Sequence, residues 1–316
     1  MGHDNYSEPR GQEIQNHGPN ELFRLLHKAA TNPRLALRIL ALRILSKIEK
    51  AEFVGEQKIR SAADSGHYIK IVRKASSGSK AFQSFKRHPY YLDILEHVTK
   101  SQGDEYLKIV QDESPSFMKM LDQFRENDLI GRPLTYRFGS HGEFSPTTLR
   151  YMKVASDLRV LFGDLESFDV AEIGCGYGGQ LLILDKVWKL GSYTMFDLDP
   201  VLSLICRYLE SHLLRTSYHP TTLNRFKGKG TFDLAISNYA FSELPADLQS
   251  VYIEKVLCKA RRGYLTMNSG RGGVFQKGKM TIDDLQKSLP PFEIIEERPL
   301  TAGHNFIIAW GMTGKG

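Results

Sequence analysis

Apolar runs and helical patterns alternate along the second half of this chain, and this alternation constrains the fold more than any other feature. The apolar runs span residues 169–174, 192–197, 232–237, 263–267, 292–296 and 305–310, and helical patterns fill 178–190, 200–214 and 246–261. Strands separated by helices of this length predict βαβ units and a mostly parallel sheet in an α/β fold. Only "ERPLTAGH" separates the last two runs, which predicts an antiparallel hairpin at the edge of that sheet.

A chain of 316 residues is longer than one ordinary domain, and its composition divides it into three parts. Residues 1–20 are rich in Gly, Asn, His and Pro, and we expect them to be a disordered tail. Residues 21–135 have helical patterns, which we interpret as an N-terminal helical domain that forms a lid and part of the acceptor pocket. Residues 136–316 contain the alternating strands and helices. Within them, Ser145 is suited to cap a helix that has Pro146 in its first position.

The net charge of +6 comes from the N-terminal third of the chain. Residues 1–100 contain 17 Lys and Arg against 10 Asp and Glu, whereas residues 101–316 contain 25 against 26. A basic region of this kind indicates a solvated face or a lining for an acidic ligand more often than a nucleic-acid surface. We therefore interpret the basic region as a solvated face or a lining for an acidic ligand, and we keep RNA as an alternative partner.

Other features of the sequence bear on where the protein works. The piece "RLALRILALRILSKIEK" has basic residues on opposite sides of a helical wheel, so it predicts packing against another domain or a second subunit rather than binding to a membrane surface. No apolar run reaches membrane-spanning length, and the polar start does not resemble a secretory signal. The three cysteines are far apart in the sequence, which fits neither a disulfide framework nor a zinc site and favours the cytoplasm.

A glycine-rich turn follows the first of these strands, in "EIGCGYGGQ". Its glycines match both the dinucleotide fingerprint G-x-G-x-x-G and the E-x-G-x-G-x-G motif of S-adenosylmethionine (SAM) methyltransferases. Glu172 favours the second interpretation. A carboxylate at this point would repel the pyrophosphate of NAD, whereas it would attract the ammonium and sulfonium groups of SAM.

Polar residues also follow the next two strong strands. Asp197 ends the second strand, where a carboxylate accepts hydrogen bonds from the ribose hydroxyls of a nucleoside cofactor. Ser237, Asn238 and Tyr239 follow the central strand, at the edge where α/β sheets bind ligands. No set of oxygen ligands for Mg²⁺ has the spacing found in catechol-type enzymes, so we predict no metal site.

Taken together, the segments "EIGCGYGGQ", "FDLDPVLSL", "SNYAFSELP", "RGYLTMNSG" and "FSPTTLRYMKVASDLRVLFG" resemble the sugar O-methyltransferase family of class I SAM-dependent methyltransferases. The resemblance runs from about Asn127 to the C-terminus. It implies a Rossmann-like, seven-stranded sheet with a terminal antiparallel hairpin, and it implies SAM as the cofactor and a small-molecule or glycan acceptor. The expected cofactor-binding residues are Glu172, Gly174, Cys175, Gly176, Gly178, Asp197, Leu198, Ser237, Asn238 and Tyr239.

Methyl transfer to a sugar hydroxyl needs a general base, because such a hydroxyl is barely acidic. His304, in "TAGHNFIIAW", is our first candidate, and His141 and Glu243 are the others. Three alternatives to a sugar O-methyltransferase stay open. They are an RNA methyltransferase that uses the basic N-terminal region, an NAD-dependent oxidoreductase, and a SAM-binding protein without catalytic activity.

Overall fold

The computed structural model describes residues 66–228, 230–268 and 278–313, all of which belong to the second of two compact units, Val54–Gly316. The predicted tail and the basic piece at residues 34–50 lie outside the described residues. The described helices are α3 (Gly66–Ser77), α4 (Ser79–Phe82), α5 (Pro89–Ile94), α6 (Lys100–Glu113), α7 (Leu121–Phe124), α8 (Pro146–Phe162), α9 (Gly179–Val187), α10 (Asp199–Leu209), α11 (Ala240–Glu243), α12 (Ala246–Lys255) and α13 (Ile282–Ser288).

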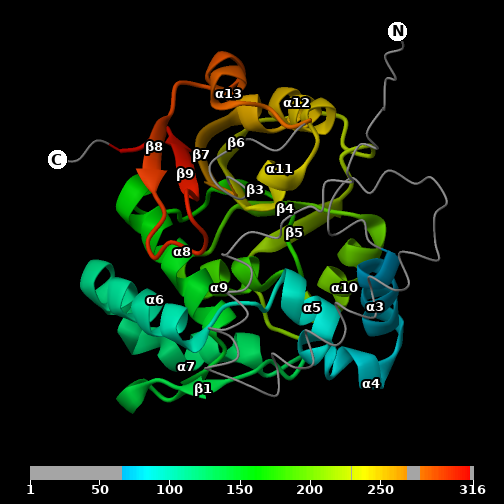
Figure 1. Ribbon diagram of the computed structural model, residues 1–316, viewed down its shortest axis with the longest axis vertical. Coiled ribbons are helices and arrows are strands. Elements are labelled where there is room, and N and C mark those ends of the chain that lie inside the picture. Colours follow the sequence, from blue (N-terminus) through cyan, green and yellow to red (C-terminus); the bar gives the residue numbers. More distant parts are fainter. Residues whose placement is uncertain (1–65, 229, 269–277, 314–316) are drawn as a thin grey trace, which may run out of the picture. The chain divides into compact units, whose positions relative to one another are not determined.

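A seven-stranded sheet forms the centre of this unit (Figure 1). Its strands are β3 (Asp169–Ile173), β4 (Ser192–Phe196), β5 (Ser217–Thr221), β6 (Phe232–Asn238), β7 (Ala260–Met267), β8 (Glu293–Glu296) and β9 (Phe306–Trp310). The spatial order is β5-β4-β3-β6-β7-β9-β8. The first five strands in this order are parallel, and β9 runs antiparallel to both of its neighbours. The predicted Rossmann-like, mostly parallel seven-stranded sheet with a terminal antiparallel hairpin is confirmed.

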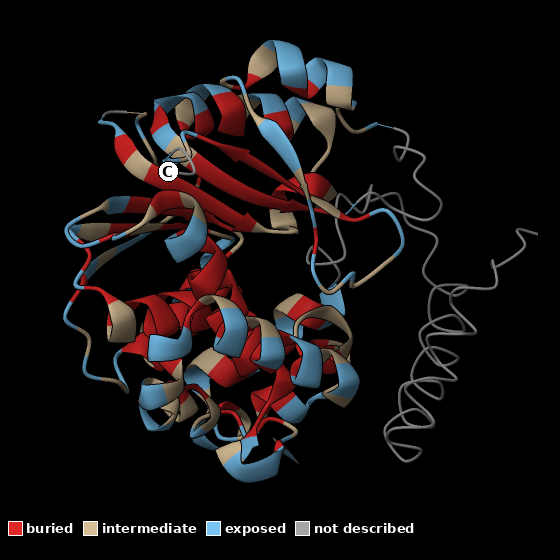
Figure 2. Ribbon diagram, turned by 90° about the vertical axis from the view of Figure 1, so that its left-hand side faces the viewer, coloured by how far each residue is buried: buried red, intermediate tan, exposed pale blue. Residues whose placement is uncertain are grey.

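Helices cover both faces of the sheet, and the central strands between them are buried, whereas the edge strands β5 and β8 are largely exposed (Figure 2). Alternate residues of each strand point to opposite faces. Val170 and Leu234 belong to the apolar cluster that includes α8, α9 and α10, whereas Ala171 and Ala235 belong to the cluster that includes α12 and α13. Because both faces are covered, the central strands read as nearly continuous apolar runs.

The helices before residue 135 pack into the same apolar cluster as α8 to α10. Arg207 of α10 donates hydrogen bonds of 3.0 Å to the carbonyl oxygens of Ala75 and Ser76, at the end of α3. These bonds satisfy carbonyl groups that a helix end leaves without an internal partner. Helices from both sides of the predicted boundary between residues 135 and 136 therefore share one core.

The start of α8 is confirmed as the sequence predicts it. Ser145 Oγ accepts a hydrogen bond of 3.2 Å from the backbone N–H of Thr148, and Pro146 is the first helical residue. A short two-stranded ladder, β1 (Tyr136–Arg137) with β2 (Glu143–Phe144), precedes this helix. Among the described helices, none combines the length and the apolar composition that a membrane span needs.

Candidate functional site

The glycine turn lies between the end of β3 and the start of α9, at the edge of the sheet where the parallel strands end. Gly174 has φ of 76° and Gly176 has φ of 62°, a region that favours glycine. A Cβ atom on Gly174 would lie 2.0 Å from the Cβ atom of Ala240, at the start of α11. The turn therefore needs glycine both for its backbone angles and for the close approach of α11.

The side chain of Glu172 is buried beneath this turn, with 2% of its surface exposed. The hydroxyl of Tyr193 in β4 donates a hydrogen bond of 3.0 Å to its carboxylate. Burial and, to a smaller extent, the nearby Asp197 raise the pKa of Glu172, while hydrogen bonds from Tyr193 and Asn238 lower it, and the resulting pKa is about 8. A carboxyl group is thus held where no cation of the described residues compensates its ionised form.

Asp197 follows β4 and lies half-buried beside the same turn. Its carboxylate accepts hydrogen bonds of 2.8 Å from the backbone N–H groups of Cys175 and Leu198. Burial raises the pKa of Asp197 to about 6, although these N–H groups and that of Gly176 favour the carboxylate. The side chain of Leu198 is 38% exposed. The turn therefore brings two carboxyl groups with raised pKa values to the ends of adjacent parallel strands.

Three polar residues, the last two of β6 and the one that follows it, have different roles. The hydroxyl of Ser237 donates to the carbonyl oxygen of Ile173 at 2.9 Å and accepts from the N–H of Phe241 at 3.0 Å, so it ties β6 to β3 and to α11. Asn238 donates from its Nδ2 to Gln180 Oε1 at 3.4 Å, and its buried Oδ1 has no hydrogen-bond partner among the described residues. Of Ser237 and Asn238, it is Asn238 whose Oδ1 remains able to accept a hydrogen bond from a ligand.

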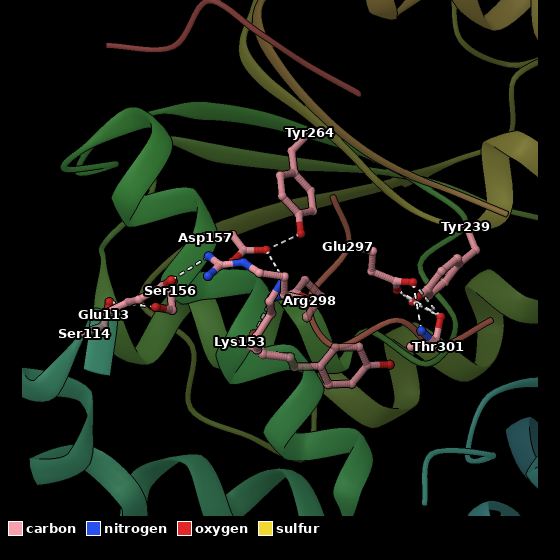
Figure 3. A network of polar contacts seen from close by, with 12 residues as sticks. Glu113, Ser114, Lys153, Ser156, Asp157, Tyr239, Tyr264, Glu297, Arg298 and Thr301 are labelled. Carbon is pink, nitrogen blue, oxygen red and sulfur yellow. Dashed lines mark hydrogen bonds and ion pairs between the residues drawn. The ribbon is translucent and has the colours of Figure 1, made fainter. Parts of the chain in front are cut away.

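Tyr239 has a φ of 72°, which is uncommon for a residue with a large side chain. Its hydroxyl donates to the carboxylate of Glu297 and lies 3.1 Å from Thr301 Oγ1, as Figure 3 shows. Both partners belong to the segment between β8 and β9. Burial and Glu297 raise the pKa of Tyr239. The contact holds the β8–β9 connection against the end of β6.

Two buried charged residues beside the turn were not identified from the sequence. Arg150, in α8, is 7% exposed and donates to the carbonyl oxygen of Leu95 at 3.2 Å, but its Nε has no hydrogen-bond partner among the described residues. Glu96 is 8% exposed, and its Oε1 likewise has no such partner. Burial raises the pKa of Glu96. A single Arg in a helix and a Glu in a helical region give no local pattern that separates them from surface charges.

The three candidate bases lie in different parts of the structure. His304 is exposed and lies two residues before β9, whose first residue pairs with the last residue of β7, so it is at the same edge of the sheet as the glycine turn. Glu243 ends α11, directly after β6, and burial raises its pKa while Lys279 lowers it. His141 lies between β1 and β2, and its carbonyl oxygen accepts from Arg125 at 3.2 Å. Figure 1 shows β1 far from β8 and β9.

No family model matches the chain, and no curated protein is similar to it in sequence. Solved structures with a similar fold include SAM-bound CalS10, an amino pentose methyltransferase from Micromonospora echinaspora (13% identity, 51% of this chain and 89% of that chain, TM-score 0.36). Another is the magnesium protoporphyrin IX methyltransferase ChlM from Synechocystis PCC 6803 with bound SAH (15% identity, 65% of this chain and 98% of that chain, TM-score 0.40). A third is the N-methyltransferase NodS from Bradyrhizobium japonicum (16% identity, 50% of this chain and 92% of that chain, TM-score 0.38). At these identities and TM-scores, the function of this chain has to be argued from its own residues.

Proposed function

We propose that this chain is a SAM-dependent methyltransferase. The observation that carries the proposal is the pair of carboxyl groups at the glycine turn, Glu172 with a pKa of about 8 and Asp197 with a pKa of about 6. A cationic ligand would stabilise both carboxylates, whereas a pyrophosphate would repel them. This difference supports SAM and argues against NAD, although both cofactors suit a glycine turn of this kind.

The polar atoms beside the turn fit the parts of SAM. Asp197 is suited to accept hydrogen bonds from the two ribose hydroxyls, and the exposed side chain of Leu198 offers an apolar contact for the base. The unpartnered Oδ1 of Asn238 would accept a hydrogen bond from the ammonium group, and the unpartnered Nε of Arg150 would donate one to the carboxylate. When bound, SAM supplies a methyl group on a positively charged sulfur.

The acceptor that we propose is a hydroxyl group of a sugar or glycan, methylated without a metal ion. The chain must hold this hydroxyl in line with the methyl group, exclude water and remove the hydroxyl proton. His304 is our first candidate for the base, because its imidazole is exposed at the edge of the sheet where the turn lies. Glu243 is the second, because it lies at the end of α11, directly after β6, and burial raises its pKa, which makes its carboxylate a stronger base. His141 is the third.

Binding and turnover test this proposal separately. We expect calorimetry to show that the full chain binds SAM and not NAD, and that Asp197→Asn weakens SAM binding at least tenfold. Incubation with SAM and a panel of nucleotide sugars, glycans and RNA, read by mass, should then show a gain of one methyl group on a sugar. Binding of NAD instead of SAM would refute the proposal. Methylation of RNA alone would replace the sugar by the nucleic-acid alternative, and SAM binding without turnover would indicate a protein that binds SAM only.

Substitution of the candidate bases identifies which one acts. We expect His304→Gln to abolish turnover while SAM binding persists, and a matched control, His219→Gln in the exposed edge strand β5, to leave turnover unchanged. If His304→Gln turns over normally and Glu243→Gln does not, Glu243 takes the role of the base.

A further inference from the structure

A cavity of about 300 Å³ lies between α3 and the segment from α4 to α5. One wall is a single face of α3, which presents His67, Lys70 and Lys74 at the mouth and Ile71 and Ala75 at the floor. These positions follow the i, i+3, i+4, i+7 and i+8 spacing of one helical face. The volume is at the lower end of the range for small-molecule sites.

The opposite wall adds hydroxyl and aromatic groups. It contains Ser84, Phe85, His88 and Tyr90. The ring of Tyr90 is stacked on His67 with a centroid distance of 4.9 Å and on His88 with a distance of 6.0 Å. The cavity is therefore lined by a stack of aromatic rings beside its lysines.

The described lining of the cavity contains cationic side chains and no Asp or Glu. From residue 66 to residue 92, the sequence has six Lys and Arg and no Asp or Glu. Lys70 and Lys74 form an i, i+4 pair of like charge, which destabilises a helix, and neither makes an ion pair with a described residue.

The groups of the two walls are close enough to act on one ligand. Burial lowers the pKa of His88, and the ammonium group of Lys74 on the opposite wall lowers it further. An anion between them would relieve this repulsion and would also lie between Lys70 and Lys74. Lys74 is in the last turn of α3, where its charge also favours the helix dipole, but Lys70 is one turn earlier and has no such role.

We propose that this cavity binds a small molecule that carries a phosphate monoester on a ring. The phosphate lies between Lys70, Lys74 and His88, and the ring lies against Tyr90. A sugar phosphate and a mononucleotide share this chemistry. The wall residue Phe85 packs edge-on against Tyr177 of the glycine turn, with a centroid distance of 5.8 Å, so the site neighbours the turn. The inference goes beyond the proposed methyl transfer and does not depend on it.

Calorimetry on the full chain without SAM tests the proposal, with glucose 6-phosphate and uridine monophosphate as the probes and glucose and uridine as their neutral controls. We expect one phosphorylated probe to bind with a stoichiometry of one, and the affinity to fall when NaCl is raised. Lys70→Gln and Lys74→Gln should each weaken this binding about fivefold to tenfold, the effect of losing one exposed charge contact. The probe that binds more tightly shows whether the ligand is a sugar phosphate or a mononucleotide.

Arg73→Gln is the matched control, because Arg73 is an exposed cation of the same helix that does not line the cavity. We expect it to bind the probe within twofold of the parent chain, and all variants to keep the parent's thermal midpoint. The proposal is overturned if neither phosphorylated probe binds, or if Arg73→Gln weakens binding as much as the lysine variants. It is also overturned if an RNA oligonucleotide binds far more tightly than uridine monophosphate and if Lys70→Gln, Lys74→Gln and Arg73→Gln weaken this RNA binding equally. That result would indicate an extended nucleic-acid surface instead of a small-molecule cavity. Failure here with intact SAM binding leaves the proposed methyltransferase function standing.

Discussion

Replacing Glu172 by Gln removes a buried group whose ionisation opposes folding. The pKa of Glu172 in the folded chain is about 8, compared with an ordinary value of 4.5. Between these two values, the folded chain holds a proton that the unfolded chain releases. The free energy of unfolding of the parent chain therefore falls as pH rises through this window, and the fall ends above pH 8.

The expected change in the free energy of unfolding can be worked out for the range from pH 6 to pH 9, where urea unfolding is easy to measure. Each pH unit between the two pKa values changes the free energy of unfolding by about 1.4 kcal/mol. Between pH 6 and pH 9, the parent chain should lose about 3 kcal/mol through Glu172, whereas Glu172→Gln loses none of this. The amide nitrogen of Gln has to accommodate the hydroxyl of Tyr193, which adds an offset that does not vary with pH.

Urea unfolding of both chains at half-unit steps from pH 6 to pH 9 measures this difference, because contributions of the other titrating groups cancel. We expect the stability of Glu172→Gln relative to the parent to rise by about 3 kcal/mol across the series. Asp112→Asn, at an exposed position of α6, is the control and should give a constant difference. A constant difference for Glu172→Gln as well would refute the reasoning, since Glu172 would then titrate as an ordinary exposed carboxyl group.

Three further predictions concern the turn and α8. The affinity for SAM should fall as pH drops, below about 8 through protonation of Glu172 and below about 6 also through protonation of Asp197. Calorimetry on Asp197→Asn should show only the part of the fall that Glu172 causes. The buried carboxylate of Asp157 lies 2.5 Å from the ammonium group of Lys153 and accepts a hydrogen bond of 2.5 Å from Tyr264 (Figure 3). Because Lys153→Met leaves this buried carboxylate without its cation, it should lower the free energy of unfolding by about 3–5 kcal/mol. Tyr264→Phe removes only the hydrogen bond and should lower it by about 1–2 kcal/mol. Ser145→Ala should cost about 1–2 kcal/mol in the same urea assay, because it removes the cap of α8; equal stability of variant and parent would contradict this role.

Local signals explain the parts of the fold that were predictable. The alternation of apolar runs and helical patterns indicated the parallel sheet and its terminal hairpin, because burial on both faces demands continuous apolar strands. The start of α8 at Pro146 and the glycine turn after β3 were readable because a cap and a positive φ depend on a few neighbouring residues. Glu172 and Asp197 were readable because the ends of parallel strands meet at one edge.

The remaining features depend on residues that are far apart in the sequence. The hydroxyl of Ser237, a residue that is predicted to lie beside the cofactor, joins β6 to Ile173 and Phe241. The unpartnered atoms of Glu96 and Arg150 are defined by what packs around them, which no local pattern records.

The sequence by itself determined the class of fold and the position of the glycine turn, because both follow from periodicity and from residues next to one another. Only the tertiary structure decided which polar groups are buried without a partner, how far burial raises the pKa of Glu172, and that α3 and α5 enclose a cationic cavity. Desolvation and charge repulsion act through space, so their strength is known only once distant segments of the chain are brought together.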